Sequence, residues 1–314
     1  MIDITPNPLL ASIGSIEIRW YGLAYVAAIT GGTWLVTHEA RRRGERTDVI
    51  LDGLIFIAIA GLIGGRLYHV IDQWAYYSNN LAQIVLPPYS GLGVYGGLFT
   101  GLLATIWFAR RRHLDFWRWA DILAPGILLA QVIGRWGNFA NQELYGPPTT
   151  LPWGIAIQCQ YRSNTPWPCP VGADPSAVLD HFHPLFLYES LLSLVGVFAM
   201  LWLWRHFTAR GRLFIAGDVG MLYFVWYGTE RSLLEFFRSG YDWTFFGLGT
   251  AQIVGLGSAI AAIAVIVLRH RLSKEGPQAV SLDGAPQHAP DAPDAPPDAP
   301  PDAPDARPAP LLDS

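Results

Sequence analysis

Charged and amide side chains interrupt an otherwise apolar sequence at a few places. The densest group lies in GRWGNFANQELYG, residues 134–146, which follows the apolar run ILAPGILLAQVI and holds an arginine, two asparagines and a glutamate within nine residues. An ionisable group inside a bilayer costs roughly 2.5–3.5 kcal/mol on insertion scales, so each one is a candidate for function. Similar groups recur along the chain, namely Arg66, His69, Asp72, Arg135, Asn138, Asn141, Glu143, Glu189, Glu230, Arg231, Glu235 and Arg238.

The segment YGTERSLLEFFR, residues 227–238, places polar groups on one face of a helix. Tyr227, Arg231, Glu235 and Arg238 are spaced i, i+4, i+8 and i+11, and this spacing brings them to a single side. Glu235 and Arg238 are also candidates for an ion pair that ties helices together. We expect the arginines here to outnumber their partner carboxylates, which favours an anionic ligand. Arginine binds phosphate well through bidentate hydrogen bonds and weak hydration, so a phospholipid is an expected substrate.

The composition indicates which elements must hold these groups. The chain has 314 residues, of which 51% are hydrophobic and 15% charged, unlike a typical soluble enzyme. A bilayer core of about 30 Å requires roughly 20 apolar residues per helix. We therefore expect an all-α polytopic membrane protein with seven transmembrane helices, at residues 17–37, 49–72, 91–109, 120–138, 184–204, 217–237 and 248–268.

The basic residues predict the orientation of these helices. The segments HEARRRGERTD, RRRHLDFWR, RHFTARGR and RHRLSK hold 14 of the 21 lysines and arginines, so every second loop is basic. Cytoplasmic loops carry the excess of positive charge, which predicts an N-terminus outside and a cytoplasmic C-terminus. Residues 1–15 lack a basic n-region and an obvious cleavage site. The first apolar segment is therefore expected to be a retained helix and not a signal peptide.

Two segments differ from the expected membrane domain of residues 1–274. Residues 139–183 are rich in turn-forming residues and predict a small extracytoplasmic cap with short strands. Cys159 and Cys169 both lie in it, and on the oxidising side of the membrane they either form a disulfide or remain free thiols. Residues 275–314 repeat Pro, Ala and Asp, a composition that buries too little apolar surface to fold and predicts a disordered cytoplasmic tail.

The polar stretch GRWGNFANQELYG resembles the signature of the prolipoprotein diacylglyceryl transferase family. It matches every fixed position of that pattern: Gly-Arg, any residue, Gly-Asn-Phe, any residue, Asn, any residue, Glu, two residues, Gly. Further blocks are similar to those of the family and occur in the same order, namely RWYGLAY, GGR, GLGVYGG, HPLFLYE and YGTERSLLEFFR. The resemblance covers most of the chain up to about residue 240.

The resemblance implies an enzyme of the bacterial cell membrane with its active site toward the outer leaflet. It would transfer the diacylglyceryl group of phosphatidylglycerol to the lipobox cysteine of a preprolipoprotein, forming a thioether and releasing glycerol phosphate. The acceptor cysteine belongs to the substrate, so Cys159 and Cys169 are not expected to be nucleophiles. Such a site must favour a thiolate, whose free pKa is ~8.5, and stabilise a departing phosphate. We expect a monomer with no metal, no cofactor and no nucleic-acid partner.

The resemblance also implies roles for individual residues. Arg135 and Arg231 would be the principal phosphate binders. The residues implied around the headgroup and the cavity are Asn138, Glu143, Tyr21 and Tyr227. His183 and Glu189 would shape the outer rim, and Glu235 and Arg238 would form a supporting pair. The supporting positions are Arg66, Asn141, His183, Glu189, Glu235 and Arg238.

Tyr95 is a departure from the family pattern, because many members carry at this position a histidine that is often proposed as the base. A tyrosine with a pKa of ~10 is a poor general base at neutral pH. Either the base lies elsewhere, or the positive field of Arg135 and Arg231 favours the thiolate; Tyr95 is then a participant or a packed interfacial aromatic. Leu185 and Phe186 are a second departure, since polar residues are common at these positions in the family.

Two other classes of membrane protein compete with a transferase. A transporter or channel for an anionic solute or lipid is the main alternative, since intramembrane charge alone does not distinguish the two. Transport folds tend to contain paired repeats, whereas this sequence shows no repeat and an odd number of predicted helices. An intramembrane protease is disfavoured because no G-x-S-x-G or H-E-x-x-H string occurs. The segments AGLIGG, GLGVYGG and GGLFTG are expected to permit close helix packing, and not to form an ion filter.

Overall fold

The computed structural model describes residues 1–14, 16–85, 91–162, 166–211, 213–237, 244–245 and 247–273. The chain divides into two units, Met1–Gly284 and Ala285–Ser314, and every described residue belongs to the first. The predicted tail at residues 275–314 and the predicted supporting residue Arg238 therefore lie outside the described residues.

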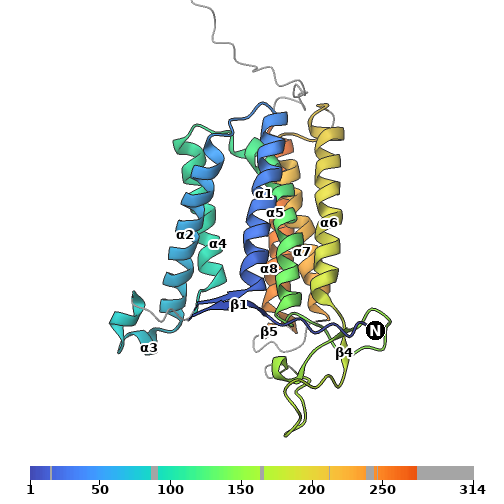
Figure 1. Cartoon of the computed structure of the whole chain (residues 1–314). Helices are drawn as coiled ribbons and strands as arrows, with labels where there is room; N and C mark the ends of the chain where they lie inside the picture. Colours follow the sequence, from blue (N-terminus) through green and yellow to red (C-terminus); the bar gives the residue numbers. More distant parts are fainter. Residues whose placement is uncertain are drawn as a thin grey trace, which may run out of the picture. The chain divides into compact units, whose positions relative to one another are not determined.

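Long helices make up most of the described chain (Figure 1). In these ranges they are α1 (Trp20–Arg42), α2 (Val49–Asp72), α4 (Val94–Arg111), α5 (Phe116–Ala140), α6 (Leu185–Leu203), α7 (Asp218–Glu235) and α8 (Thr250–Leu272). A π-helical turn, η3 (Trp204–Thr208), continues α6, while α3 (Trp74–Tyr77) and η1 (Leu81–Ile84) lie between α2 and α4. Each long helix overlaps one predicted span, with its ends shifted by a few residues. The fold is mostly helical, as expected.

Four helices of the described chain are long and apolar enough to cross a membrane by length and composition alone. They are α2, α5, α6 together with η3 (Leu185–Thr208), and α8. The helices α1, α4 and α7 are not among them. Helix α7 illustrates the reason, because Asp218, Glu230, Arg231 and Glu235 lower its hydropathy.

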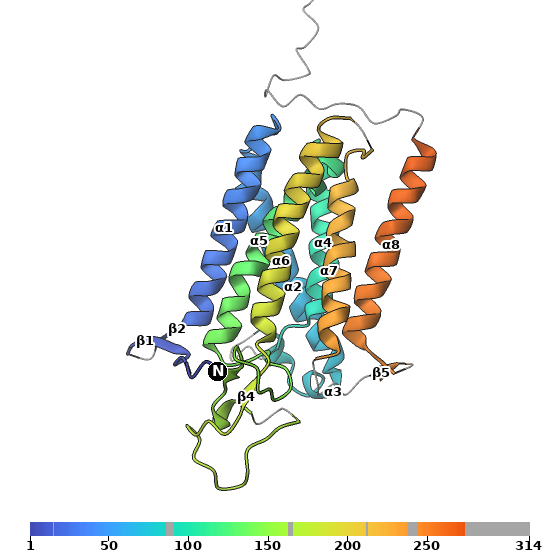
Figure 2. The same cartoon turned by 90° about the vertical axis from the view of Figure 1, so that its right-hand side faces the viewer.

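The helices pack side by side as one bundle (Figure 2). The main contacts are those of α1 with α5, α2 with α4, α7 with α8, and α5 with α6 and α7. At the centre lies an apolar cluster that draws on four helices and contains Leu35, Leu128, Val197, Met200 and Val219. Helix α5, which carries the polar signature at its end, is thus held by neighbours on several sides.

Glycines allow α2 and α4 to pack closely. A Cβ atom at Gly96 would clash with the backbone oxygen of Gly64, and one at Gly97 would lie 3.1 Å from the oxygen of Gly61. The backbone N–H of Gly93 also donates to the oxygen of Gly65 at 2.8 Å. The expectation that AGLIGG, GLGVYGG and GGLFTG serve close packing is confirmed.

Residues 139–183 form the predicted small cap at one end of the bundle. It contains the antiparallel strands β3 (Ile155–Ala156) and β4 (His181–Phe182) and the short helix η2 (Cys159–Tyr161). Cys159 and Cys169 form a disulfide, which is one of the two states left open by the sequence. The cap has its own apolar cluster, made of Tyr145, Ile155, Ile157, Phe182 and Phe186.

The strands outside the cap are the part of the fold that the prediction missed. Besides the cap strands, β1 (Leu9–Ile13) pairs with β2 (Ile16–Arg19), and β5 (Thr244–Phe245) pairs with β6 (Leu248–Gly249). Such short, locally paired strands leave almost no alternating pattern in a sequence. Strand β1, LLASI, shows no clear alternation of apolar and polar residues.

Candidate active site

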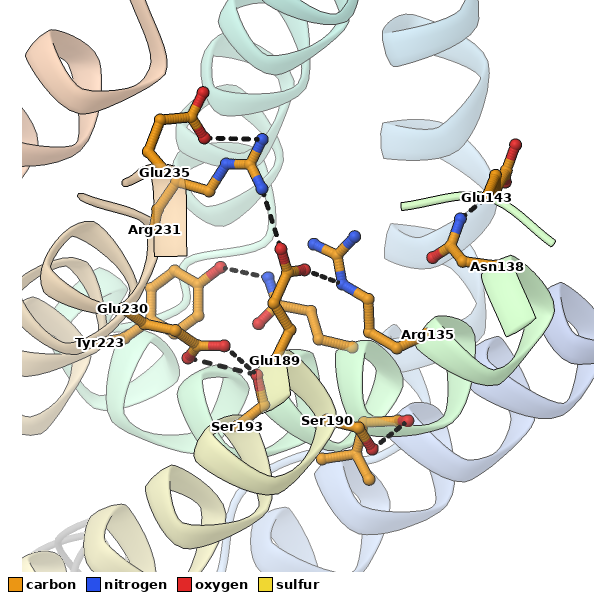
Figure 3. Close-up of polar contacts among 12 residues, drawn as sticks. Arg135, Asn138, Glu143, Glu189, Ser190, Ser193, Tyr223, Glu230, Arg231 and Glu235 are labelled. Carbon is orange, nitrogen blue, oxygen red and sulfur yellow. Dashed lines mark hydrogen bonds and ion pairs between the residues drawn. The ribbon is translucent and has the colours of Figure 1, made fainter. Parts of the chain in front are cut away.

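Three helices bring the central charged residues together at the cap end of the bundle. Arg135 comes from the last turns of α5, Glu189 from the first turns of α6, and Arg231 from the last turns of α7. The Nε of Arg135 lies 2.5 Å from Glu189 Oε2, and Arg231 Nη1 donates to Glu189 Oε1 at 3.0 Å. Figure 3 shows the Glu189 carboxylate between the two guanidinium groups. We refer to these three residues as the arginine cluster.

Further carboxylates surround the arginine cluster. Glu235 lies 3.6 Å from Arg231 Nη2, one helical turn along α7. Glu230 is buried and accepts a hydrogen bond from Ser193 Oγ at 3.1 Å. The expectation of more arginines than partner carboxylates is therefore wrong for this site. The packing of α6 against α7 places Glu189 among groups that lie far from it in the sequence.

Glu235 was expected to pair with Arg238, which lies outside the described residues. Within the described chain the partner of Glu235 is Arg231. This i, i+4 contact agrees with the predicted polar face of α7. Tyr227 also lies on α7, where its ring stacks on that of Tyr223 with centroids 6.0 Å apart.

Arg135 keeps hydrogen-bond donors free within the part of the chain that the structure describes. The side chains of Arg135 and Arg231 are 19% and 17% exposed, whereas that of Glu189 is 6% exposed. Among the described residues, the two terminal nitrogens of Arg135 have no hydrogen-bond or ion-pair partner, and Figure 3 draws a dashed line only at its Nε. A guanidinium edge of this kind binds two oxygens of a phosphate at once.

Polar contacts behind the cluster fix the helices that carry it. Gln131 Nε2 on α5 donates to the hydroxyl of Tyr223 on α7 at 3.1 Å. Ser190 Oγ on α6 donates to the backbone oxygen of Val132 on α5 at 3.0 Å. These bonds join α5 to both other helices one turn away from Arg135. Figure 3 shows Tyr223 beside the charged groups and Ser190 below them.

The signature segment folds back on itself after α5 ends. Asn138 Nδ2 donates to Glu143 Oε1 at 2.7 Å, and the backbone N–H of Glu143 donates to the oxygen of Asn138 at 3.0 Å. Gln142 and Leu144 have φ angles of 53° and 57°, a region that non-glycine residues seldom occupy. Strain of this kind persists only where surrounding contacts hold it. The segment therefore presents Asn138 and the exposed Glu143 as one unit.

Gln142 is a residue that the sequence reasoning missed. It is 2% exposed, and its Nε2 donates to the backbone oxygen of Pro6 at 3.1 Å and to Gln158 Oε1 at 3.0 Å. Its own oxygen accepts the backbone N–H of Gln158 at 3.0 Å. Gln142 thus joins the N-terminal segment, the signature and the cap. An uncharged residue in a polar run carries no signal that separates it from solvated loop residues.

Three other predicted residues lie near the cap end of the bundle. Tyr21 packs against Gly137 of α5, where an added Cβ atom would lie 3.0 Å from the tyrosine ring, and its hydroxyl lies 3.3 Å from that of Tyr25. His183 Nδ1 lies 3.1 Å from the Tyr188 hydroxyl, where the cap joins α6. The side-chain oxygen of Asn141 is buried and accepts no hydrogen bond from the described residues.

Arg66 and Tyr95 lie on the α2 and α4 pair. Arg66 donates to the backbone oxygens of Gln83, Ile84 and Gly91 at 2.7, 3.2 and 3.3 Å, which ties down the connection between the two helices. Tyr95 is 44% exposed and its ring meets that of Tyr68 edge-on at 6.4 Å. Within the described chain its hydroxyl has no hydrogen-bond partner and makes no contact with the arginine cluster.

The apolar residues Leu185 and Phe186, which are the second departure from the family pattern, are buried. They are 2% and 3% exposed, and Phe186 stacks on Phe139 with ring centroids 5.0 Å apart. These positions fill the interface between the cap and α6 with apolar side chains. Hydrogen bonding at this point is supplied instead by neighbouring groups such as His183 and Tyr188.

The sequence was compared with protein families and known proteins. The family model of prolipoprotein diacylglyceryl transferase matches residues 8–268, most of the chain. This chain belongs to that family. It is therefore a transferase and a multi-pass membrane protein, and the alternative of a transporter or channel is not supported. The matched range contains every predicted site residue.

The chain is similar to individual members of this family over nearly their whole length. The chain is 37% identical to a phosphatidylglycerol–prolipoprotein diacylglyceryl transferase of Geobacillus kaustophilus over 257 residues, which cover 82% of this chain and 90% of the relative. It is 34% identical to one from Lactobacillus acidophilus over 274 residues, which cover 87% and 94%. A third, from a Nostoc species, is 35% identical over 274 residues, covering 85% and 92%.

Proposed function

We propose that Arg135 and Arg231 bind the phosphate of phosphatidylglycerol while this chain transfers the diacylglyceryl group of that lipid to the cysteine thiol of a prolipoprotein. This reaction is the first step of bacterial lipoprotein maturation. The observation that carries the proposal is the partly exposed arginine cluster, in which both terminal nitrogens of Arg135 remain free within the described chain. Family membership supplies the reaction, and the geometry suggests where it occurs.

The chemistry follows from what the reaction must stabilise. The thiolate sulfur attacks the CH2 carbon of the diacylglyceryl group, a C–S bond forms, and the C–O bond to the phosphate breaks. The bonding electron pair stays on the departing glycerol phosphate, whose negative charge increases. Two fixed guanidinium groups beside that oxygen stabilise the charge as it develops. Proton loss from the thiol is favoured by the same positive field.

Glu189 positions the two arginines and does not itself bind the substrate in this proposal. Its carboxylate accepts a hydrogen bond from Arg231 and forms an ion pair with Arg135, and this fixes the separation of the two guanidinium groups. A buried charge pair that loses one partner is strongly destabilised, so the arrangement is held firmly. Asn138, Glu143, Tyr21 and Tyr227 are proposed to line the headgroup region around it.

Tyr95 is proposed to be a packing residue. Its exposed ring on α4 and its contact with Tyr68 support this assignment. The thiol proton acceptor in this proposal is a group other than Tyr95.

The proposed topology has seven transmembrane helices, with the cap and the arginine cluster outside and the active site at the outer leaflet. It is supported by the basic residues of the loops after α1 and α4, since Arg41, Arg42, Arg110 and Arg111 all lie in last turns at the other end of the bundle. Positive loops favour the cytoplasm. All residues of the cluster come from one chain, so a monomer is sufficient.

The proposal is tested by transfer to a peptide. The purified full chain is incubated in detergent micelles with phosphatidylglycerol and a lipobox peptide, and the mass gain of the peptide thiol is measured. Arg135→Ala is expected to lose transfer by about 10²- to 10³-fold, the typical effect of removing one oxyanion donor. Arg110→Ala is the matched control, because it removes an exposed arginine at the other end of the bundle. Near-normal transfer by Arg135→Ala would remove this residue from the site.

A further variant tests the positioning role of Glu189. Glu189→Gln keeps the shape of the side chain but weakens its hold on both guanidinium groups. We expect kcat to fall by roughly tenfold with a smaller change in KM, because misplaced donors act chiefly on the transition state. An unchanged kcat would show that the carboxylate is not needed to position them.

A further inference from the structure

A groove runs between α1 and α2 at the end of the bundle opposite the cap. It has a volume of about 470 Å³, which is in the range of small-molecule sites. Helices α1 and α2 are joined at this end, as Figure 1 shows, but their mutual contact is not among the main helix contacts of the bundle. The groove shares no residue with the arginine cluster.

One wall of the groove is polar. Thr30, Thr33 and Thr37 line it together with His38 and Arg41, and the spacing of these residues puts them on one face of α1. Thr30, His38 and Arg41 are exposed. The Thr37 hydroxyl donates to the backbone oxygen of Thr33 at 2.8 Å, so the exposed cation at the end of this wall, Arg41, is the group able to bind a partner from outside the protein.

The opposite wall and the floor are apolar. Leu51 and Leu54 from the first turns of α2 line the groove with Ile29 of α1. Trp34 lies on the rim, is 64% exposed and stacks on the His38 ring with centroids 5.8 Å apart. Exposed tryptophan is typical of the boundary between the acyl chains and the headgroups. The groove thus offers apolar surface along its length and polar groups toward its charged end.

Arg41 differs from the other arginines around the α1–α2 turn. Arg42 and Arg43 pair with Glu39 at 3.5 and 3.0 Å, and Arg46 pairs with Asp48 at 2.7 Å. Arg41 pairs with no carboxylate among the described residues. Its positive charge therefore remains available at the mouth of the groove, where an anion is favoured.

We propose that this groove binds an anionic phospholipid, with its phosphate at Arg41 and His38 and one acyl chain along Leu51 and Leu54. A basic cluster next to a transmembrane helix attracts anionic lipids, and the apolar wall selects a lipid over a free phosphate. The site is separate from the catalytic one. The proposal depends only on the chain being embedded in a membrane, so it stands or fails independently of the roles given to Arg135 and Arg231.

The experiment uses the full chain in nanodiscs of phosphatidylcholine. Phosphatidylserine with a photoactivatable acyl chain is added as the probe, and phosphatidylcholine carrying the same acyl chain is the comparison. After illumination, the labelled positions are mapped by peptide mass spectrometry. We expect label within residues 29–54 from the serine lipid at about five times the level obtained with the choline lipid.

Arg41→Gln is expected to reduce the label in residues 29–54 by about fivefold. Arg110→Gln is the matched control, since it removes one exposed positive charge at the same end of the bundle without touching the groove. Both variants should retain transfer within twofold, which shows that they fold. A second variant, Leu54→Trp, should block labelling by filling the groove. Equal labelling by the two lipids, or labelling that survives Arg41→Gln, would overturn the proposal.

Discussion

Two groups of charged residues at opposite ends of the bundle use the same side-chain types differently. At the cap end, the two arginines of the arginine cluster, Arg135 and Arg231, are partly exposed, and the terminal nitrogens of Arg135 have no partner among the described residues. At the other end lies a buried charge cluster, made of Glu39, Arg43, Asp121, Asp218 and His270. There the Arg43 and Glu39 side chains are only 4% and 2% exposed and lie 3.0 Å apart.

The members of the buried charge cluster contact other groups of the protein. Asp121 accepts the backbone N–H groups of Gly217 and Gly220 at 2.9 and 2.8 Å, and Asp218 lies 2.6 Å from His270 Nε2. Burial lowers the pKa of the Arg43 guanidinium, and the adjacent Glu39 acts against this shift. Its charges join α1, α5, α7 and α8. The buried cluster is not fully hydrogen-bonded, since Arg43 Nε and Nη1 and Asp218 Oδ1 have no hydrogen-bond partner in the described chain. The comparison teaches that the two groups differ in exposure: the bundle encloses Arg43 and Glu39, whereas Arg135 keeps accessible donors.

The largest expected effect concerns the cap end. Arg231→Ala should reduce transfer by about 10²- to 10³-fold, and it should also reduce stability, because Glu189 and Glu235 would lose a cationic partner. Transfer to the lipobox peptide and thermal unfolding in detergent micelles measure the two effects. Arg231→Lys should recover most of the stability and little of the transfer, since lysine lacks the forked donors. Full recovery of transfer by lysine would argue against bidentate phosphate binding.

The buried charge cluster should show the opposite response. Asp121→Ala leaves the N–H groups of Gly217 and Gly220 without their acceptor, so the free energy of unfolding should fall by about 2–3 kcal/mol. Transfer measured well below the unfolding temperature should stay within twofold.

Asp52→Ala is the matched control for that variant. Asp52 pairs with Arg112 at 2.7 Å, but its side chain is 57% exposed, and an exposed pair contributes little. If Asp121→Ala abolished transfer without loss of stability, the division between the two clusters would be wrong.

A smaller effect is expected in the cap. Replacing Cys159 and Cys169 together by serine removes the disulfide, which closes a short loop. Unfolding of the cap should become easier by about 2 kcal/mol, and proteolysis at residues 170–176 should accelerate. Transfer should remain, because neither cysteine is a nucleophile in the proposed reaction. Loss of activity equal to that of Arg231→Ala would instead give the cysteines a chemical role.

The smallest effect is expected at Tyr95. Its hydroxyl has no hydrogen-bond partner in the described chain, and its ring only contacts Tyr68. Tyr95→Phe should therefore change kcat by less than about twofold, since no hydrogen bond is lost. A collapse of turnover with lipid binding intact would place the hydroxyl in the reaction and extend the active site to α4.

Much of the fold was predictable because apolar runs of membrane length leave a strong signal. The ends of α2 agree fully with the expectation of 49–72, and the shared face of Tyr227, Arg231 and Glu235 follows from helical spacing. Short strands were expected in the cap, where β3 and β4 contain two residues each. The strands β1 and β2 and the strands β5 and β6 were not predicted, since such short pairs leave almost no sequence pattern.

The residues of the candidate site could be proposed from the sequence, but most contacts between them could not. Arg135, Asn138 and Glu143 stand in one contiguous motif, so local sequence already brings them close, and the Asn138–Glu143 bond follows from the turn after α5. The role of Glu189 as a shared partner of two arginines depends on how α6 lies between α5 and α7. Gln142 likewise gains its importance only from the strand and the N-terminal segment that it joins.

The sequence by itself determined the membrane-embedded helical class, the family and the residues proposed to bind a phosphate, because periodicity and contiguous motifs are local properties. Tertiary structure decided which arginines are enclosed by the bundle and which stay partly exposed. A charge is neutralised by whatever lies next to it in space, and helix packing brings together groups such as Arg135, Glu189 and Arg231 that are far apart along the chain. For this reason the same residue types hold the bundle together at one end and remain open to a substrate at the other.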